Sequence, residues 1–156
     1  MQAEFFSRLK ECLGSRTAIV GIGNTLKADD GLGPLLVQGL RGKTPACLFD
    51  CGEVPENYTR PIIRSNPETI IIVDAADWSA AAGELRFIKA EEIRNFSLST
   101  HNASLSIFLD YLKGELPRAE IIIVGVQTGN RQLMQSLSPG VEATLNQLLD
   151  FFKGCG

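Results

Sequence analysis

Three residues of this sequence combine side-chain types and positions that would suit a metal ion: Asp30, Asp74 and His101. Each lies where an apolar run meets a loop or the start of a helix. His101 is the only histidine among the 156 residues, so a histidine-containing metal site within one chain must use it. Two oxygen donors and one imidazole suit a divalent metal ion that keeps coordination positions open for a further ligand.

Each of these residues also has a simpler interpretation. One of the adjacent Asp29 and Asp30 is expected to cap the following helix, because anionic side chains favour the positive end of a helix. The other is then free for chemistry. Taken alone, Asp74 could be a solvated strand end and His101 a surface loop residue. The joint pattern favours the metal site.

His101 precedes a predicted helix, and this position has an electrostatic consequence. The helix dipole disfavours the imidazolium form, and a metal ligand must be the neutral ring. Ser99 and Thr100 are available as helix caps or as hydrogen-bond partners of the metal ligands.

The glycines at positions 21, 23 and 33 follow a predicted strand and precede a predicted helix, as in dinucleotide-binding motifs. Their spacing differs from such a motif, because nine residues separate Gly23 from Gly33 and two of them are aspartates. Acidic side chains at the mouth of a phosphate site would repel the ligand. We therefore do not predict a nucleotide cofactor.

Hydrophobic periodicity predicts an alternation of strands and helices. Strands are expected at 17–22, 46–50, 69–74, 84–88 and 120–126, helices at 5–13, 31–41, 56–64, 105–112 and 138–152, and irregular structure at 89–100. Several of these strands are apolar throughout, which indicates a largely parallel sheet covered by helices on both faces. Sites in such sheets lie outside the carboxyl ends of the strands. Asp30 is expected at the end of a loop, Asp74 at a strand end and His101 in a loop that enters a helix. All three side chains could therefore lie at that edge of the sheet.

Length and composition predict one globular domain covering residues 1–156, with 44% apolar and 21% charged residues. No apolar run approaches the roughly 20 residues that cross a bilayer. We see no secretory signal, and we expect a cytoplasmic protein with no membrane partner. The net charge of −3 is spread along the chain and leaves no basic stripe for nucleic acid.

The four cysteines, at positions 12, 47, 51 and 155, include no Cys-x-x-Cys pair. Cys47 and Cys51 are four residues apart, which is a weak zinc signal without a second pair. Reduced thiols are the better interpretation.

Several motifs together resemble the hydrogenase maturation endopeptidases. They are Gly-Ile-Gly-Asn-x-Leu-x-x-Asp-Asp-Gly-x-Gly at 21–33, Ile-Val-Asp-Ala at 72–75 and Thr-His-Asn at 100–102. The segment Asp-Cys-Gly-Glu-Val-Pro-Glu-Asn at 50–57 is similar to the branch that processes enzymes of the formate-hydrogenlyase type. The resemblance runs from about Thr17 to the C-terminus.

This resemblance implies an aspartyl-type endopeptidase that removes the C-terminal extension of a nickel–iron hydrogenase large-subunit precursor after nickel insertion. Asp30, Asp74 and His101 fall where the family places its nickel ligands, and Asp50 falls on a further aspartate near the site. Nickel would be the cofactor, supplied mainly by the precursor. The precursor would be the partner, and we expect the protease to be a monomer.

The resemblance also implies a fold: a three-layer α/β structure with a five-stranded, mostly parallel sheet and helices on both faces. One strand, at 84–88, would be antiparallel. Cys51 departs from the pattern, since the family usually has glycine there. That departure puts in doubt a tight turn with positive φ at this residue, and it places a thiol near the site.

Two other functions stay open at this point. One is a non-catalytic chaperone that checks the large subunit for nickel and leaves cleavage to another protein. The other is an unrelated metal-dependent hydrolase of small molecules. The chain has no Gly-x-Ser-x-Gly elbow and no recognisable Cys/His pair, which argues against a covalent nucleophile. A metal ion could instead polarise the scissile carbonyl or activate water.

Overall fold

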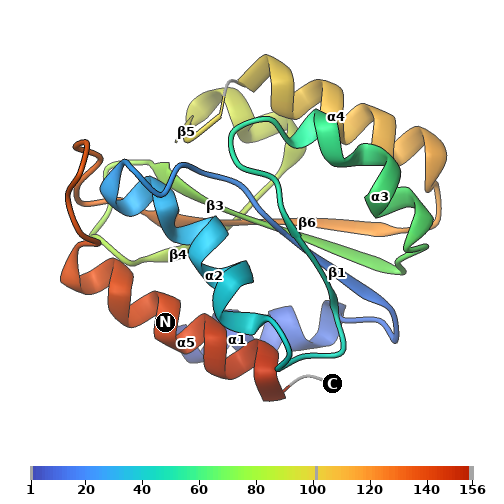
Figure 1. The fold of residues 1–156 in the computed structure, drawn as a ribbon, viewed down its shortest axis with the longest axis horizontal. Helices are drawn as coiled ribbons and strands as arrows, with labels where there is room; N and C mark the ends of the chain where they lie inside the picture. Colours follow the sequence, from blue (N-terminus) through green and yellow to red (C-terminus); the bar gives the residue numbers. More distant parts are fainter. Residues whose placement is uncertain (1, 101, 155–156) are drawn as a thin grey trace.

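The computed structural model describes residues 2–100 and 102–154, which are built around a mixed β-sheet (Figure 1). The strands are β1 (Thr17–Gly21), β2 (Cys47–Asp50), β3 (Thr69–Asp77), β4 (Leu85–Ile88), β5 (Ser97–Leu98) and β6 (Glu120–Gln127). They are ordered β2-β1-β3-β6-β4, and β5 pairs with β3 outside this path. Strands β2, β1, β3 and β6 are parallel, whereas β4 is antiparallel to β6 and β5 is antiparallel to β3.

Helices cover both faces of this sheet (Figure 1). One face carries α1 (Gln2–Cys12), α2 (Leu32–Leu40) and α5 (Pro139–Gly154), and the other carries α3 (Thr59–Arg64) and α4 (Asn102–Glu115). Short 3₁₀ helices are η1 (Ala28–Gly31), η2 (Pro55–Tyr58) and η3 (Ala90–Asn95). Alternate residues of β3 enter opposite cores: Ile71 and Val73 pack with α1, α2 and α5, while Ile70 and Ile72 pack on the α3 and α4 side.

The predicted fold class is confirmed. The parallel strands are buried on both faces, which is why they are near-continuous runs of Ile and Val. The antiparallel strand expected at 84–88 is β4, paired with β6 from Leu85↔Val126 to Ile88↔Ile123. The predicted helices and the other strands also form, with ends that shift by a few residues.

Two details of the prediction are wrong. Asp74 does not end its strand, because β3 continues to Asp77. The segment 89–100 is not irregular, because it contains η3 and β5. Strand β3 continues past the end of β1 because β6 pairs with it as far as Ala76 and β5 pairs with Ala76 and Asp77.

Cys12, Cys47 and Cys51 are free thiols, and Cys155 lies outside the described residues. Cys51 is buried in the core beneath α3 and α4. The positive φ of the following turn falls on Gly52, at 54°. The turn expected at Cys51 is therefore made one residue later, and it remains compatible with the cysteine. Within the described ranges, no helix is long and apolar enough to cross a bilayer.

Candidate functional site

Asp30 lies in η1, between the end of β1 and the start of α2, and only 7% of it is exposed. The loop that leads to it folds back closely, so that Asn24 N donates to Asp30 O at 2.8 Å. Gly23 has a φ of 151°, and a Cβ atom there would lie 1.9 Å from Asp30 O. Glycine at this position is therefore what allows the loop to bring Asp30 to the sheet edge.

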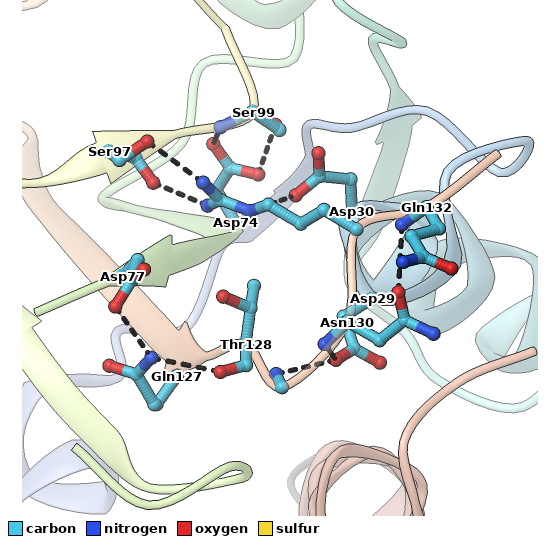
Figure 2. Close-up of polar contacts among 12 residues, drawn as sticks. Asp29, Asp30, Asp74, Asp77, Ser97, Ser99, Gln127, Thr128, Asn130 and Gln132 are labelled. Atoms are coloured by element: carbon cyan, nitrogen blue, oxygen red, sulfur yellow. Dashed lines mark hydrogen bonds and ion pairs between the residues drawn. The ribbon is translucent and has the colours of Figure 1, made fainter. Parts of the chain in front are cut away.

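Asp74 lies in β3 one residue past the point where β1 ends, since Gly21 pairs with Val73. It is 1% exposed. Ser99 holds its carboxylate with two hydrogen bonds: the Ser99 amide donates to Oδ2 at 3.2 Å, and the Ser99 hydroxyl donates to Oδ1 (Figure 2). Ser99 therefore bonds to one of the predicted metal ligands, and the assignment of Asp74 as a ligand stays a prediction.

Figure 2 shows the side chains of Asp30 and Asp74 pointing into the same space at the carboxyl edge of the sheet. Burial raises the pKa of the Asp74 carboxyl to about 8. The hydrogen bonds from Ser99 lower this pKa, and the nearby charge of Asp30 raises it. Burial also raises the pKa of Asp30, although Arg131 and Lys27 oppose the shift. Two buried carboxyls in one space favour the binding of a cation.

A cation is already present beside this pair, in the side chain of Arg131. Its Nε lies 2.8 Å from Asp30 Oδ1. Its Nη1 donates to Ser97 Oγ at 2.8 Å, and its Nη2 donates to the Ser97 carbonyl. The guanidinium therefore joins η1 to β5, the strand that leads to Ser99.

His101, the third predicted ligand, lies outside the described residues. The described chain on either side of it is well anchored. Thr100 is buried, and its hydroxyl donates to the Glu53 carbonyl at 2.9 Å, while Asn102 begins α4. The prediction that His101 is a ligand stays a prediction.

Asp50 lies at the end of β2, and in the described part of the chain its hydrogen bonds are to residues other than Asp30 and Asp74. It accepts hydrogen bonds from Gln38 Nε2 at 3.5 Å and from the Gly52 amide at 3.3 Å. It lines a hollow of about 270 Å³ together with Glu53. The Glu53 charge raises the pKa of Asp30, so this acidic hollow neighbours the pair.

Asp29 has a different role from the one expected. No side chain caps α2, so neither Asp29 nor Asp30 is the predicted cap of that helix. Asp29 is fully buried and instead accepts hydrogen bonds from Gly129 N, Asn130 N, Ser138 N and Ser138 Oγ, each at 2.7 Å. It fastens both ends of the loop between β6 and α5, about 100 residues away in the chain, which no local signal predicts.

The donors fit a divalent cation in their chemistry. Asp30 and Asp74 supply carboxylate oxygens, and Asp30 Oδ1 is buried with no hydrogen-bond partner apart from the ion-pair contact to Arg131. In residues 2–100 and 102–154, no three His, Cys, Asp or Glu side chains form a ligand cluster. A third protein ligand would have to come from elsewhere, and His101 is the candidate.

Sequence reasoning did not find Arg131 or Glu53 as residues of this site. Arg131 belongs to a loop without a motif, and only the three-dimensional structure brings it to Asp30. Glu53 did have a signal, since it lies in the segment 50–57 that resembles the formate-hydrogenlyase branch.

The architecture and the acidic pair define a three-layer α/β protein with its site at the carboxyl edge of a parallel sheet. A family model described as HycI, hydrogenase maturation protease, matches residues 36–152. The hydrogenase 3 maturation protease of Escherichia coli K12 is 33% identical over 142 residues, which cover 86% of this chain and 89% of the relative. The chain belongs to the hydrogenase maturation protease family.

Solved structures agree with this assignment. The [NiFe] hydrogenase maturation protease HycI of Thermococcus kodakarensis superposes with a TM-score of 0.83 at 27% identity, covering 95% of this chain and 97% of that one. The endopeptidase HycI of Escherichia coli gives a TM-score of 0.78 at 27% identity, with coverage of 89% and 90%. The resemblance to the hydrogenase maturation endopeptidases is therefore confirmed, including the HycI-like branch.

Proposed function

We propose that this chain is the endopeptidase that removes the C-terminal extension of a nickel–iron hydrogenase large-subunit precursor after nickel insertion. Membership of the maturation protease family supports the reaction and the kind of partner. The assignment of this activity to particular residues rests on one observation: the buried carboxyls of Asp30 and Asp74 lie together at the carboxyl edge of the sheet.

In this proposal Asp30, Asp74 and His101 hold the nickel ion that the precursor brings. Three protein ligands leave coordination positions for groups of the precursor, as in metal sites that act on a substrate. When bound, the nickel supplies a Lewis acid beside the scissile carbonyl. The specificity for nickel would come from the precursor, because two carboxylates and an imidazole do not select one divalent metal by affinity.

The chain itself orients the ligands. Ser99 fixes both oxygens of Asp74, and the bond from Thr100 to Glu53 anchors the chain just before His101. Asp50 lies in the neighbouring acidic hollow, where we propose that it faces the entering peptide. Fixed ligands lower the cost of ordering the site when the precursor arrives.

The test is cleavage of purified precursor, read as a shift to a shorter band and as a released C-terminal peptide by mass spectrometry. We expect cleavage of nickel-loaded precursor and none of nickel-free precursor. Asp74→Asn and His101→Ala should abolish cleavage while the protein stays folded. Asp110→Asn, which makes the same change at an exposed position on α4, is the matched control and should cleave normally.

The outcomes separate the alternatives. Equal cleavage of both precursors would contradict the nickel requirement and leave the protease activity in place. Stable binding of the nickel-loaded precursor without cleavage would favour the chaperone. Hydrolysis of small esters or amides, with no effect on the precursor, would favour the small-molecule hydrolase.

We also propose that the protease acts as a monomer in the cytoplasm. Light scattering after size-exclusion chromatography measures the first property, and cell fractionation with an antibody to the chain measures the second.

A further inference from the structure

The contact between Arg131 and Asp30 occupies one of the two carboxylate oxygens with which Asp30 could bind a metal ion. Arg131 Nε lies 2.8 Å from Asp30 Oδ1, and among the described residues neither atom has a hydrogen-bond partner that could replace this contact. The ion pair occupies Oδ1, which a metal bound through both carboxylate oxygens would share, and its positive charge repels a cation that binds through either oxygen. Binding of the cation is therefore opposed while Arg131 stays in place and is favoured when Arg131 moves away.

The surroundings allow such a movement. The side chain of Arg131 is 26% exposed, against 9% for that of Asp30, so the guanidinium can reach water while the carboxylate stays buried. Among residues 2–100 and 102–154, its hydrogen bonds and ion pairs are with Asp30 and Ser97 alone. Its loop is fastened at Gly129, Asn130 and Ser138 by Asp29, so the side chain can leave while the loop stays attached.

We propose that Arg131 is an internal competitor of the metal: its guanidinium neutralises Asp30 in the free protein and opposes the binding of a divalent cation to that carboxylate until the guanidinium moves away. This rests on the proposed function, in which Asp30 is a metal ligand. The competition lowers the affinity of the free protease for metal ions in solution. A metal ion presented by a docked precursor, at high effective concentration, overcomes it.

A nearby charge that does not block Asp30 provides the control. Lys27 also acts on the Asp30 carboxyl through its charge, but it makes no ion pair with Asp30. Removal of Lys27 makes the site more negative without freeing Oδ1, whereas removal of Arg131 does both. The comparison between Lys27→Gln and Arg131→Gln therefore separates competition for the oxygen from the general electrostatic field.

The experiment is calorimetric titration of the purified full-length protein with Ni²⁺ and with Cd²⁺. We expect Arg131→Gln to bind both ions about tenfold more tightly than the wild type, because an opposing charge–charge contact no longer has to be broken. Lys27→Gln should change the affinity by about twofold. Arg131→Lys, which keeps a cation at the position, should stay closer to the wild type than Arg131→Gln does.

Equal or weaker binding by Arg131→Gln, or an equal gain in Lys27→Gln, overturns the proposal. Should Arg131→Gln not fold, as judged by circular dichroism, Ser97→Ala takes its place: it removes one hydrogen bond that holds the guanidinium, and tighter metal binding is again expected.

Asp30→Asn and Asp74→Asn test the proposed metal site itself. If neither weakens binding, the proposed metal site fails; if both weaken it while Arg131→Gln matches the wild type, only the competition fails.

Discussion

Asp29 and Asp30 are adjacent in the chain, but their carboxylates have different hydrogen-bond partners. Asp29 accepts four hydrogen bonds from the loop between β6 and α5, and its carboxylate is satisfied by the fold itself. Among the residues that the structure describes, Asp30 forms an ion pair with Arg131 alone, and burial raises the pKa of its carboxyl. One aspartate is therefore used for structure, and its neighbour is left for a ligand.

This difference predicts unequal losses of stability when the two aspartates are replaced. Asp29→Ala leaves three part-buried backbone amides without their acceptor, at about 1 kcal/mol each, and we expect it to lower the free energy of unfolding by about 3 kcal/mol. Ser138→Ala, which removes one of the same bonds, should cost about 1 kcal/mol. Asp30→Ala should cost less than Asp29→Ala, because it removes a carboxyl that burial disfavours. Urea unfolding measures all three; an equal loss at positions 29 and 30 would contradict this division of roles.

The thiol of Cys51 is next to the site in the sequence but chemically shielded. It is 1% exposed, and burial raises its pKa to about 12, with the nearby Asp50 charge adding to the shift. A thiol binds metal or reacts with electrophiles as the thiolate, and this form is scarce far below the pKa. The structure therefore argues against adventitious metal binding by Cys51.

We expect iodoacetamide at pH 8 to modify the exposed Cys47 at least about tenfold faster than Cys51 in the folded protein. Peptide mapping by mass spectrometry measures both rates in one sample. Modification in denaturant is the control, since the two rates should then converge. Cys51→Ser should still cleave the precursor; a variant that binds the precursor and does not cut it would indicate a thiol-dependent step.

At the scale of elements, the site depends on how closely α2 approaches the sheet. A Cβ atom at Gly33, in the first turn of α2, would lie 2.4 Å from Ile22 O and 2.7 Å from Val73 O. These are backbone atoms of β3 and of the loop after β1, so they cannot turn aside as a side chain would. The glycine lets η1, which directly precedes α2, hold Asp30 beside Asp74.

Gly33→Ala should therefore lower the free energy of unfolding by about 2 kcal/mol or more, because helix and sheet must separate. It should also weaken precursor cleavage by displacing η1. Gly114→Ala, in α4, is the matched control: no atom outside its own helix backbone and chain neighbours lies within 4 Å of the added methyl, so the free energy of unfolding should rise by up to about 1 kcal/mol, because alanine favours a helix over glycine. Thermal melts and cleavage assays on the two variants make the comparison, and equal stability would refute the close-packing argument.

The same elements show what can be predicted from sequence. Runs such as Ile70–Val73 and Ile121–Val124 predict buried parallel strands, because burial on both faces demands apolar residues at every position. Local sequence patterns do not predict β5, because its two residues form a strand only by pairing with Ala76 and Asp77. They also do not predict the hydrogen bonds of Asp29 or the ion pair of Arg131, because these contacts join segments about 100 residues apart. The position of His101 at the site stays a prediction from its motif.

At the scale of the molecule, exposed apolar side chains lie near the acidic site. Leu133 and Met134 are 62% and 79% exposed on the loop that carries Arg131, and Leu26 is 56% exposed on the loop that leads to Asp30. A hydrogen bond from Met134 N to Leu26 O, at 2.7 Å, joins these two loops. Together the three side chains form an apolar rim, and a protein partner that delivers its C-terminus to Asp30 would contact it.

We therefore expect Leu133→Ser and Met134→Ser, singly, to raise KM for the precursor about threefold or more and to leave kcat nearly unchanged, because they remove apolar contact without touching the ligands. Their stability should match that of the wild type, since both side chains are exposed. Ile107→Ser, at a side chain 63% exposed on α4, is the matched control and should cleave with unaltered KM. Initial rates over a range of precursor concentrations distinguish the two parameters. A fall in kcat at constant KM would mean instead that the loop acts on Arg131 and the site, and not on docking.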